Sequence, residues 1–391
     1  MTSEKLFYHA QLYQPDYDNY QEDSWFTVEN GKIKNSGVGK PPVAQEAVDL
    51  SGKFVLPGLI NCHTHVVMDP TDPLGLSKNF TIPYLTKKAL DNIQELLETG
   101  VTFFRDVGAP FDIDLELKKM IDSGEIFGPD CMVSGTPIVM TGGHGYEMGL
   151  ESDGTFEVLK HTRQLLKKGV GCIKVMATGG VMTFGETPHD VQLSVEELKA
   201  AIGEAHKKNR NTAAHAQGLQ GVKNSILAGV DSIEHGVFLD EEAIEMMVER
   251  GTYLSPTLVA PYYIVKEGTA RGIPSYMVEK SKRMVEAHMV SLEKAIKAGV
   301  KIVLGTDAGT PYNLYRNTPF ELELLTRCGM STKQAVQAAT LTGAQMLKID
   351  SEFGTLERGK YADFLVLDKD PLVDISELQR RKKVYKKGRL V

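Results

Sequence analysis

ILAGVDSIEH, residues 226–235, contains a helical apolar pattern that ends at Gly229 and a short apolar run that ends at His235. Glycine closes helices because it adopts the left-handed conformation at little cost. The same order recurs in LLETGVTFFRD (96–106), LLKKGVGCIKV (165–175) and AIKAGVKIVLGTD (295–307). Each copy is the αβ half of a βαβ unit, so the repeat predicts a parallel sheet.

Eight strands are predicted, beginning near residues 54, 101, 131, 171, 211, 231, 252 and 301. Ser194 with Glu197 three residues later is a capping box, which predicts a helix over 195–209. Eight β/α units over about 250 residues match a TIM barrel. An open doubly wound sheet binds its ligand at a single switch point, so it would not bring five separate strand ends together at one site. We therefore predict an α/β fold with a (β/α)8 TIM barrel over residues 57–354.

The two ends of the chain, residues 1–56 and 355–391, are rich in strand and turn patterns. Asn30-Gly31 between apolar runs predicts a β-hairpin, and ADFLVL (362–367) predicts a strand near the other end. Neither end is long enough to bury a core alone. We expect both to combine into one small β-sandwich domain.

Composition and charge narrow the class of protein. The net charge of −7 argues against a nucleic-acid partner, and no apolar run approaches the roughly 18 residues of a membrane span. The N-terminus lacks the apolar core of a signal peptide. The four cysteines lie far apart and are expected to be free thiols in a reducing compartment. These features predict a cytoplasmic protein with no membrane partner and are compatible with a homo-oligomer.

Metal-ligand residues stand at the ends of the predicted strands. His63 and His65 are two residues apart, so their side chains point the same way, and His215 and His235 end consecutive strands. Asp307 ends the last strand. A core histidine or a loop cap is the structural alternative for each residue alone. Because active-site residues of a barrel gather at the carboxyl ends of its strands, we expect one shared metal centre.

Lys174 is the exception, because an ammonium group cannot bind a cation. Two interpretations are open: it pairs with a carboxylate, or its amine adds carbon dioxide to become a carbamate that can bridge two metals. His144, in a glycine-rich loop, is either an exposed turn residue or a donor to a substrate carboxylate or oxyanion. Arg105, which stands next to Asp106 at the end of the second predicted strand, is expected to form an internal ion pair rather than a substrate contact. His288 is expected on a loop or a helix surface.

PGLINCHTH (57–65), together with Lys174, His215, His235 and GTD (305–307), resembles the amidohydrolase superfamily in its binuclear branch. IKVMATGG (173–180) and TGGHG (141–145) resemble its prolidase-like and imidazolonepropionase-related group, which includes Xaa-Pro dipeptidases and ochratoxin-type amidases. The resemblance implies a distorted barrel and two Zn2+ or other divalent ions, bridged by carboxylated Lys174 and hydroxide. It places one ion on His63, His65 and Asp307 and the other on His215 and His235. It also implies that Asp307 is the catalytic acid/base, and His144 is predicted as a second catalytic residue.

The predicted function is metal-dependent hydrolysis of an amide or peptide bond in a small substrate, either an Xaa-Pro dipeptide or an N-acyl amino acid. Two alternatives stay open. The first is a one-metal deaminase or cyclic-amide hydrolase of imidazolonepropionase type, in which Lys174 is unmodified. The second is a non-catalytic barrel that serves as a binding module.

Overall fold

The structure, a computed structural model, describes residues 4–14, 20–74 and 80–391, and it has mixed α/β content. Its strands form sheets of eight, six and three strands. The eight-stranded sheet contains β1 (Lys5–Leu12), β2 (Gln21–Glu29), β3 (Lys32–Val38), β4 (Glu46–Asp49), β5 (Phe54–Pro57), β15 (Phe364–Leu367), β16 (Lys383–Lys386) and β17 (Arg389–Leu390). The six-stranded sheet contains β9 (Ile138–Val139), β10 (Leu150–Glu151), β11 (Cys172–Met176), β12 (Asn211–Ala216), β13 (Ser232–His235) and β14 (Tyr253–Ser255). The three-stranded sheet contains β6 (Leu59–Thr64), β7 (Val101–Asp106) and β8 (Asp130–Val133).

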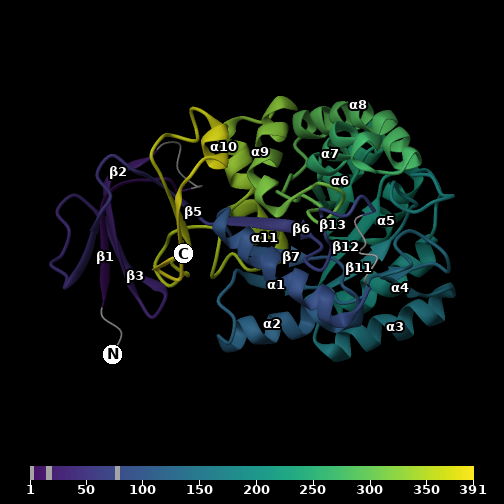
Figure 1. Cartoon of the computed structure of the whole chain (residues 1–391), viewed down its shortest axis with the longest axis horizontal. Coiled ribbons are helices and arrows are strands. Elements are labelled where there is room, and N and C mark those ends of the chain that lie inside the picture. The colour runs from purple at the N-terminus through teal and green to yellow at the C-terminus, as the bar shows by residue number, and fades with distance from the viewer. Residues whose placement is uncertain (1–3, 15–19, 75–79) are drawn as a thin grey trace.

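Helices surround the six- and three-stranded sheets. They are α1 (Ile82–Glu98), α2 (Ile113–Ser123), α3 (Gly154–Lys168), α4 (Val195–His206), α5 (Leu219–Ala228), α6 (Glu241–Arg250), α7 (Val259–Glu267), α8 (Ser275–Ala298), α9 (Thr318–Arg327), α10 (Thr332–Ala338) and α11 (Leu341–Leu347). In Figure 1, strands β6, β7 and β11 to β13 lie between α2 to α4 on one side and α6 to α9 on the other. Among the described residues, no helix combines the length and the apolar character needed to span a bilayer.

Two kinds of predicted helix signal are confirmed: the capping box at the start of a helix and the glycine that ends one. The Ser194 side chain accepts a hydrogen bond from the Glu197 backbone and the full capping box is present, although α4 ends at His206 instead of residue 209. Gly169 and Gly229 close α3 and α5 with φ of 93° and 90°, in the left-handed region. These glycine caps turn the chain from each helix into the strand that follows it.

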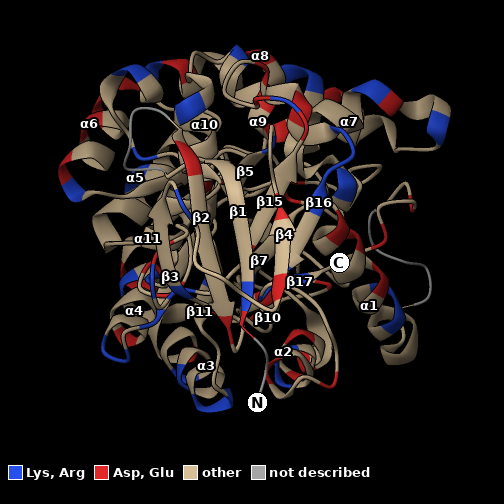
Figure 2. Ribbon diagram, turned by 90° about the vertical axis from the view of Figure 1, so that its left-hand side faces the viewer, with Lys and Arg blue, Asp and Glu red and all other residues tan. Residues whose placement is uncertain are grey.

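The eight-stranded sheet joins the two ends of the chain. Its order is β17-β16-β15-β5-β1-β2-β3, with β4 paired to β1 (Figure 2). Asn30 and Gly31 have φ of 53° and 78°, which makes the predicted tight hairpin between β2 and β3. Phe7 packs against Phe364 with ring centroids 4.9 Å apart, so residues from both ends share one core.

The segment 54–64 differs from the prediction of one continuous strand. It divides at Gly58 into β5, which pairs with β15, and β6, which pairs with β7. A Cβ on Gly58 would lie 2.2 Å from Oγ1 of Thr102, so only glycine allows the chain to pass this close to β7. The predicted first strand therefore supplies β5 to the eight-stranded sheet and β6 to the three-stranded sheet.

Strands β6 to β8 and β11 to β14 pair in parallel within their sheets. Backbone hydrogen bonds also connect the two sheets: Gly171 N donates to Val133 O at 3.0 Å. The predicted strand near Lys301 is reduced to an isolated bridge between Leu254 and Ile302, and Cys62 N donates to Leu304 O at 2.8 Å. Because paired parallel strands run in one direction, their carboxyl ends lie on one side of each sheet.

Candidate metal centre

One cavity of about 470 Å³ brings the predicted ligands together. The residues of the predicted site that line it are His63, His65, His144, Lys174, His215, His235 and Asp307. They lie within or just after β6, β11, β12 and β13, in the stretch that follows the Ile302 bridge, and in the loop that carries His144. The structure therefore gathers every predicted site residue at one place.

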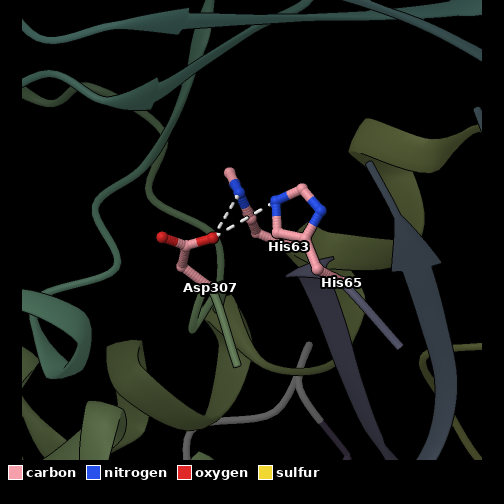
Figure 3. A group of neighbouring side chains, drawn as sticks. All are labelled: His63, His65 and Asp307. Carbon is pink, nitrogen blue, oxygen red and sulfur yellow. Dashed lines mark ion pairs between the residues drawn. The ribbon is translucent and has the colours of Figure 1, made fainter. Parts of the chain in front are cut away.

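His63, His65 and Asp307 form the tightest group (Figure 3). Nε2 of His63 and Nε2 of His65 lie 3.2 and 3.3 Å from the same oxygen, Oδ1 of Asp307. One ligand atom from each residue lies within 4.8 Å of the others. Two imidazole nitrogens and a carboxylate oxygen in a buried setting are a donor set that fits a divalent metal such as zinc.

Hydrogen bonds on the far side of each ring orient these two histidines. Nδ1 of His63 lies 2.7 Å from Oε2 of Glu234, and Nδ1 of His65 lies 3.1 Å from Gly108 O. Because each acceptor takes a proton from Nδ1, Nε2 is the nitrogen left to bind a metal, and it is the atom that faces Asp307. Metal-binding histidines usually have such an acceptor behind them.

His215 and His235 lie beside this group. Their ring centroids are 4.6 Å apart, and the ring of His235 is 5.1 Å from that of His63. Nδ1 of His235 contacts Oγ1 of Thr257 at 2.6 Å, and Nε2 of His215 contacts Gly179 O at 3.2 Å. Burial and nearby positive groups lower the pKa of both histidines well below the usual value. Neutral imidazole is the form that binds metals.

Lys174 is buried, with only 1% of its surface exposed. Burial lowers its pKa to about 8, so a substantial fraction of the amine is unprotonated near neutral to mildly alkaline pH. The ion pairs within 4.0 Å among the described residues do not include Lys174, so the first of its two interpretations, a pair with a carboxylate, is not observed. An unprotonated amine is the form that adds carbon dioxide, so a buried Lys174 with a lowered pKa fits the second interpretation.

At Asp307, contacts with neighbouring side chains outweigh the effect of burial on the pKa. Burial alone would raise its pKa, but the contacts with His63 and His65 hold this pKa well below the usual range. Its backbone φ of 54° lies in the left-handed region, and its N–H donates to His63 O at 2.9 Å. The strained backbone and this hydrogen bond turn the carboxylate toward the two imidazoles.

Arg105 forms the internal ion pair that was predicted for it, and its partner is Glu234. Nη2 of Arg105 lies 2.7 Å from Oε1 of Glu234, and both side chains are fully buried. Asp106 accepts the backbone N–H groups of Val66 and Gly108 at 2.6 and 3.1 Å. Sequence reasoning missed Glu234, although a carboxylate inside a four-residue strand was a usable signal.

The prediction for His288 is wrong, because this residue is buried in α8 and does not lie on a loop or a helix surface. Its Nε2 contacts His235 O at 2.9 Å. His235 has a φ of 74°, and this contact holds its unusual backbone in place. His288 therefore supports the strand end that carries His235.

Glu234→Gln should weaken metal binding by about 10- to 100-fold, the usual effect of losing the acceptor behind a ligating histidine. Glutamine keeps the shape of the side chain but removes the negative charge of the carboxylate, which contacts both His63 and Arg105. The measurement is competition of zinc-loaded protein with a chelator of known affinity. Unchanged zinc affinity would show that the contact between Glu234 and His63 does not support a metal ligand.

Residues 54–391 match the family model described as "Amidohydrolase family". The chain belongs to the amidohydrolase family. It is 32% identical over 375 residues to ochratoxinase of Aspergillus niger, an alignment that covers 86% of this chain and 75% of the relative. This amidohydrolase is a hydrolase acting on carbon–nitrogen bonds.

Solved structures agree with this assignment. One is a Xaa-Pro dipeptidase with methionine bound in its active site, 29% identical, with a TM-score of 0.93 and full coverage of both chains. Another is a putative prolidase from Bifidobacterium longum, 34% identical, with a TM-score of 0.87, covering 100% of this chain and 95% of the other. The amidohydrolase is therefore a prolidase-like member of its superfamily.

Proposed function

We propose that the six- and three-stranded sheets are two parts of one distorted (β/α)8 barrel over residues 57–354. Two backbone hydrogen bonds support closure of the barrel. One, from Gly171 to Val133, connects the six-stranded sheet to the three-stranded sheet, and the other, from Cys62 to Leu304, connects β6 to the stretch after the Ile302 bridge. The eighth strand is then the short stretch around Ile302. Residues 1–56 and 355–391 are proposed to form the accompanying β-sandwich domain, which their shared sheet supports.

We propose that this enzyme hydrolyses the amide bond of an Xaa-Pro dipeptide or an N-acyl amino acid at a metal centre. The observation that carries the proposal is the convergence of five metal-ligand side chains and a buried, unpaired Lys174 on one cavity. A similar structure described as a Xaa-Pro dipeptidase and a relative described as ochratoxinase support the two substrate types.

The donor set fits two divalent ions, for which Zn2+ is the natural choice. His63, His65 and Asp307 would hold one ion, His215 and His235 the other, and carboxylated Lys174 would join them. When bound, the ions would supply a water activated near neutral pH and polarise the amide carbonyl. Glu234 and Thr257 orient the ligating rings through their Nδ1 atoms.

Asp307 is the proposed acid/base. Its depressed pKa keeps it ionised before reaction, so it can accept a proton from the attacking water. It then gives this proton to the leaving nitrogen, without which an amine is a poor leaving group. The second catalytic residue, His144, faces the same cavity and is placed to donate to the substrate.

The remaining cavity wall selects the substrate mainly by apolar contact. Its apolar residues are Met68, Leu74, Phe80, Met148, Met176, Val181, Met182, Val237, Ala260, Pro261, Ile264, Tyr276, Met277 and Met284. Methionine side chains adapt to differently shaped groups, so a large apolar acyl or side-chain group is expected next to the scissile amide.

One observation favours a second candidate, the one-metal deaminase or cyclic-amide hydrolase. Within residues 4–14, 20–74 and 80–391, the tight ligand group contains only His63, His65 and Asp307. A single ion there would leave Lys174 unmodified. Metal analysis separates the two candidates: about two ions per chain supports the binuclear amidase, and one ion supports the alternative.

The test of function is a substrate panel. Protein loaded with zinc and bicarbonate is incubated with Xaa-Pro dipeptides, other dipeptides and N-acyl amino acids, and released amino acid is measured. We expect hydrolysis of substrates with a large apolar group in one of these classes. Release of ammonia from a ring amine, without cleavage of any acyclic amide, would instead support the deaminase.

Carbamate formation on Lys174 should increase with pH. Only the unprotonated amine adds carbon dioxide, and this form becomes dominant as the pH rises through about 8. Metal-free protein incubated with ¹³C-bicarbonate should therefore show a larger carbamate NMR signal at pH 9 than at pH 6.5. Lys174→Met provides the background, and a signal that persists in this variant would place the carbamate elsewhere.

A further inference from the structure

A second cavity, of about 580 Å³, has no lining residue in common with the cavity of the metal centre. Its walls come from α7, from the C-terminal end of α1 and from residues 316–320 and 379–382. Helices α7 and α9, which carry part of these walls, lie side by side (Figure 1). The volume lies within the range of small-molecule sites.

Helix α7 borders both cavities. Ala260 and Ile264 line the cavity of the metal centre, whereas Tyr263 and Lys266 line the second cavity. Residues three or four positions apart share one face of a helix, so each cavity meets a different face of α7. The second cavity is therefore a separate site and not an extension of the first.

Three half-buried aromatic rings form one wall of the second cavity. The ring centroid of Tyr262 lies 5.4 Å from that of Tyr263 and 5.0 Å from that of Phe320. Nζ of Lys266 lies 5.1 Å from the ring centroid of Tyr263. Aromatic rings that stay partly exposed at a cavity provide faces on which a planar ligand can stack.

Positive charges outnumber negative ones in this cavity. Among the described residues that line it, the only carboxylate is Glu98, and the cations are Lys266, Arg316, Arg380, Arg381 and Lys382. Arg316 pairs with Glu95, and Arg380 pairs with Glu377 at 3.0 Å. The other three cations have no ion pair within 4.0 Å in the described part of the chain. The whole chain has a net charge of −7, so three unpaired cations around one cavity run against its composition.

Lys382 is the most enclosed of these three cations. Its Nζ donates to Leu378 O at 2.6 Å and lies 3.4 Å from Arg380 O, so its partners are neutral carbonyl oxygens. Burial lowers the pKa of Lys382 to about 8, and no carboxylate opposes this effect. An anion in the cavity would favour the ammonium form of Lys382 and would be stabilised by it in return.

We propose that the second cavity binds a phosphorylated compound with a planar ring, of the class of nucleoside diphosphates. The phosphate oxygens would contact Lys266, Arg381 and Lys382, three cations that match the charge of about −3 of a diphosphate. The ring of the ligand would stack on the aromatic wall. This site lies outside the cavity of the proposed hydrolysis and does not depend on that reaction.

The test measures the binding of ADP, pyrophosphate and adenosine to zinc-loaded protein by calorimetry. ADP should bind to wild-type protein at least 10-fold more tightly than pyrophosphate, which lacks the ring, or adenosine, which lacks the charge. Lys266→Gln combined with Arg381→Gln removes two exposed cations and should weaken ADP binding by about 10-fold or more. Lys160→Gln combined with Lys167→Gln is the matched control. It removes the same charge from exposed positions of α3 and should bind ADP as wild-type protein does.

Three results overturn the proposal: no saturable binding of ADP up to about 1 mM, equal affinity of wild-type protein for ADP and pyrophosphate, or the same ADP affinity in both double variants. Equal affinity in the two variants would place ADP elsewhere, for instance on zinc, so zinc content is measured after each titration. Unchanged thermal unfolding shows that each variant is folded. Failure here is distinct from failure of the proposed function, which would appear as no amide hydrolysis in the substrate panel.

Discussion

Asp307→Asn should lower kcat for amide hydrolysis by about 10³-fold, within the range of general acid–base catalysis. Asparagine cannot take a proton from water or pass one to the leaving nitrogen. Its side-chain oxygen can still face His63 and His65, which lie 3.2 and 3.3 Å from Oδ1 in the native protein. The measurement is steady-state kinetics on the best substrate of the panel, with metal content determined on the same samples.

Asp122→Asn is the matched control, because Asp122 is exposed on α2 and pairs only with Lys118 among the described residues. It should retain wild-type kinetics. Full activity of Asp307→Asn with its metals bound would show that the proton follows another route. A loss of both metal and activity would mean that Asp307 acts first as a ligand, and activity per bound metal is then the deciding quantity.

Lys174→Ala should remove the bridge between the two proposed metals. We expect metal content to fall from about two ions per chain toward one, and kcat/KM to fall by about 10³-fold or more, since a metal contributes several kcal/mol to transition-state stabilisation. The space left by this buried side chain can admit a small carboxylate. Propionate in the assay should therefore restore part of the activity by replacing the carbamate.

Lys167→Ala, at an exposed position of α3, is the control and should respond to propionate no more than wild-type protein does. A Lys174→Ala variant that keeps two metals and most of its activity would contradict the carbamate. It would then favour the one-metal chemistry, in which the amine of Lys174 has no ligand role.

The features that the sequence predicted well are those encoded by local patterns. The turn at Asn30-Gly31 and the cap at Ser194 each depend on neighbouring residues, and both are present. The convergence of the histidines also followed from a simple rule, because each stands at the end of a strand in a repeating unit. The roles assigned to these side chains stay predictions until metal and activity are measured.

The features that the sequence could not supply depend on contacts between distant segments. Glu234 lies 171 positions from His63 and 129 from Arg105, and no local pattern joins them. Glu186 likewise reaches His144 across 42 positions. The break at Gly58 arises from its closeness to Thr102, which only packing reveals.

The most direct measurement is a crystal structure of protein loaded with zinc and bicarbonate, with diffraction recorded at the zinc absorption edge. We expect two zinc peaks about 3.5–4 Å apart. One should lie on His63, His65 and Asp307, the other on His215 and His235, with a carboxylated Lys174 between them. A single peak with an unmodified Lys174, or zinc bound outside this cavity, would contradict the binuclear centre.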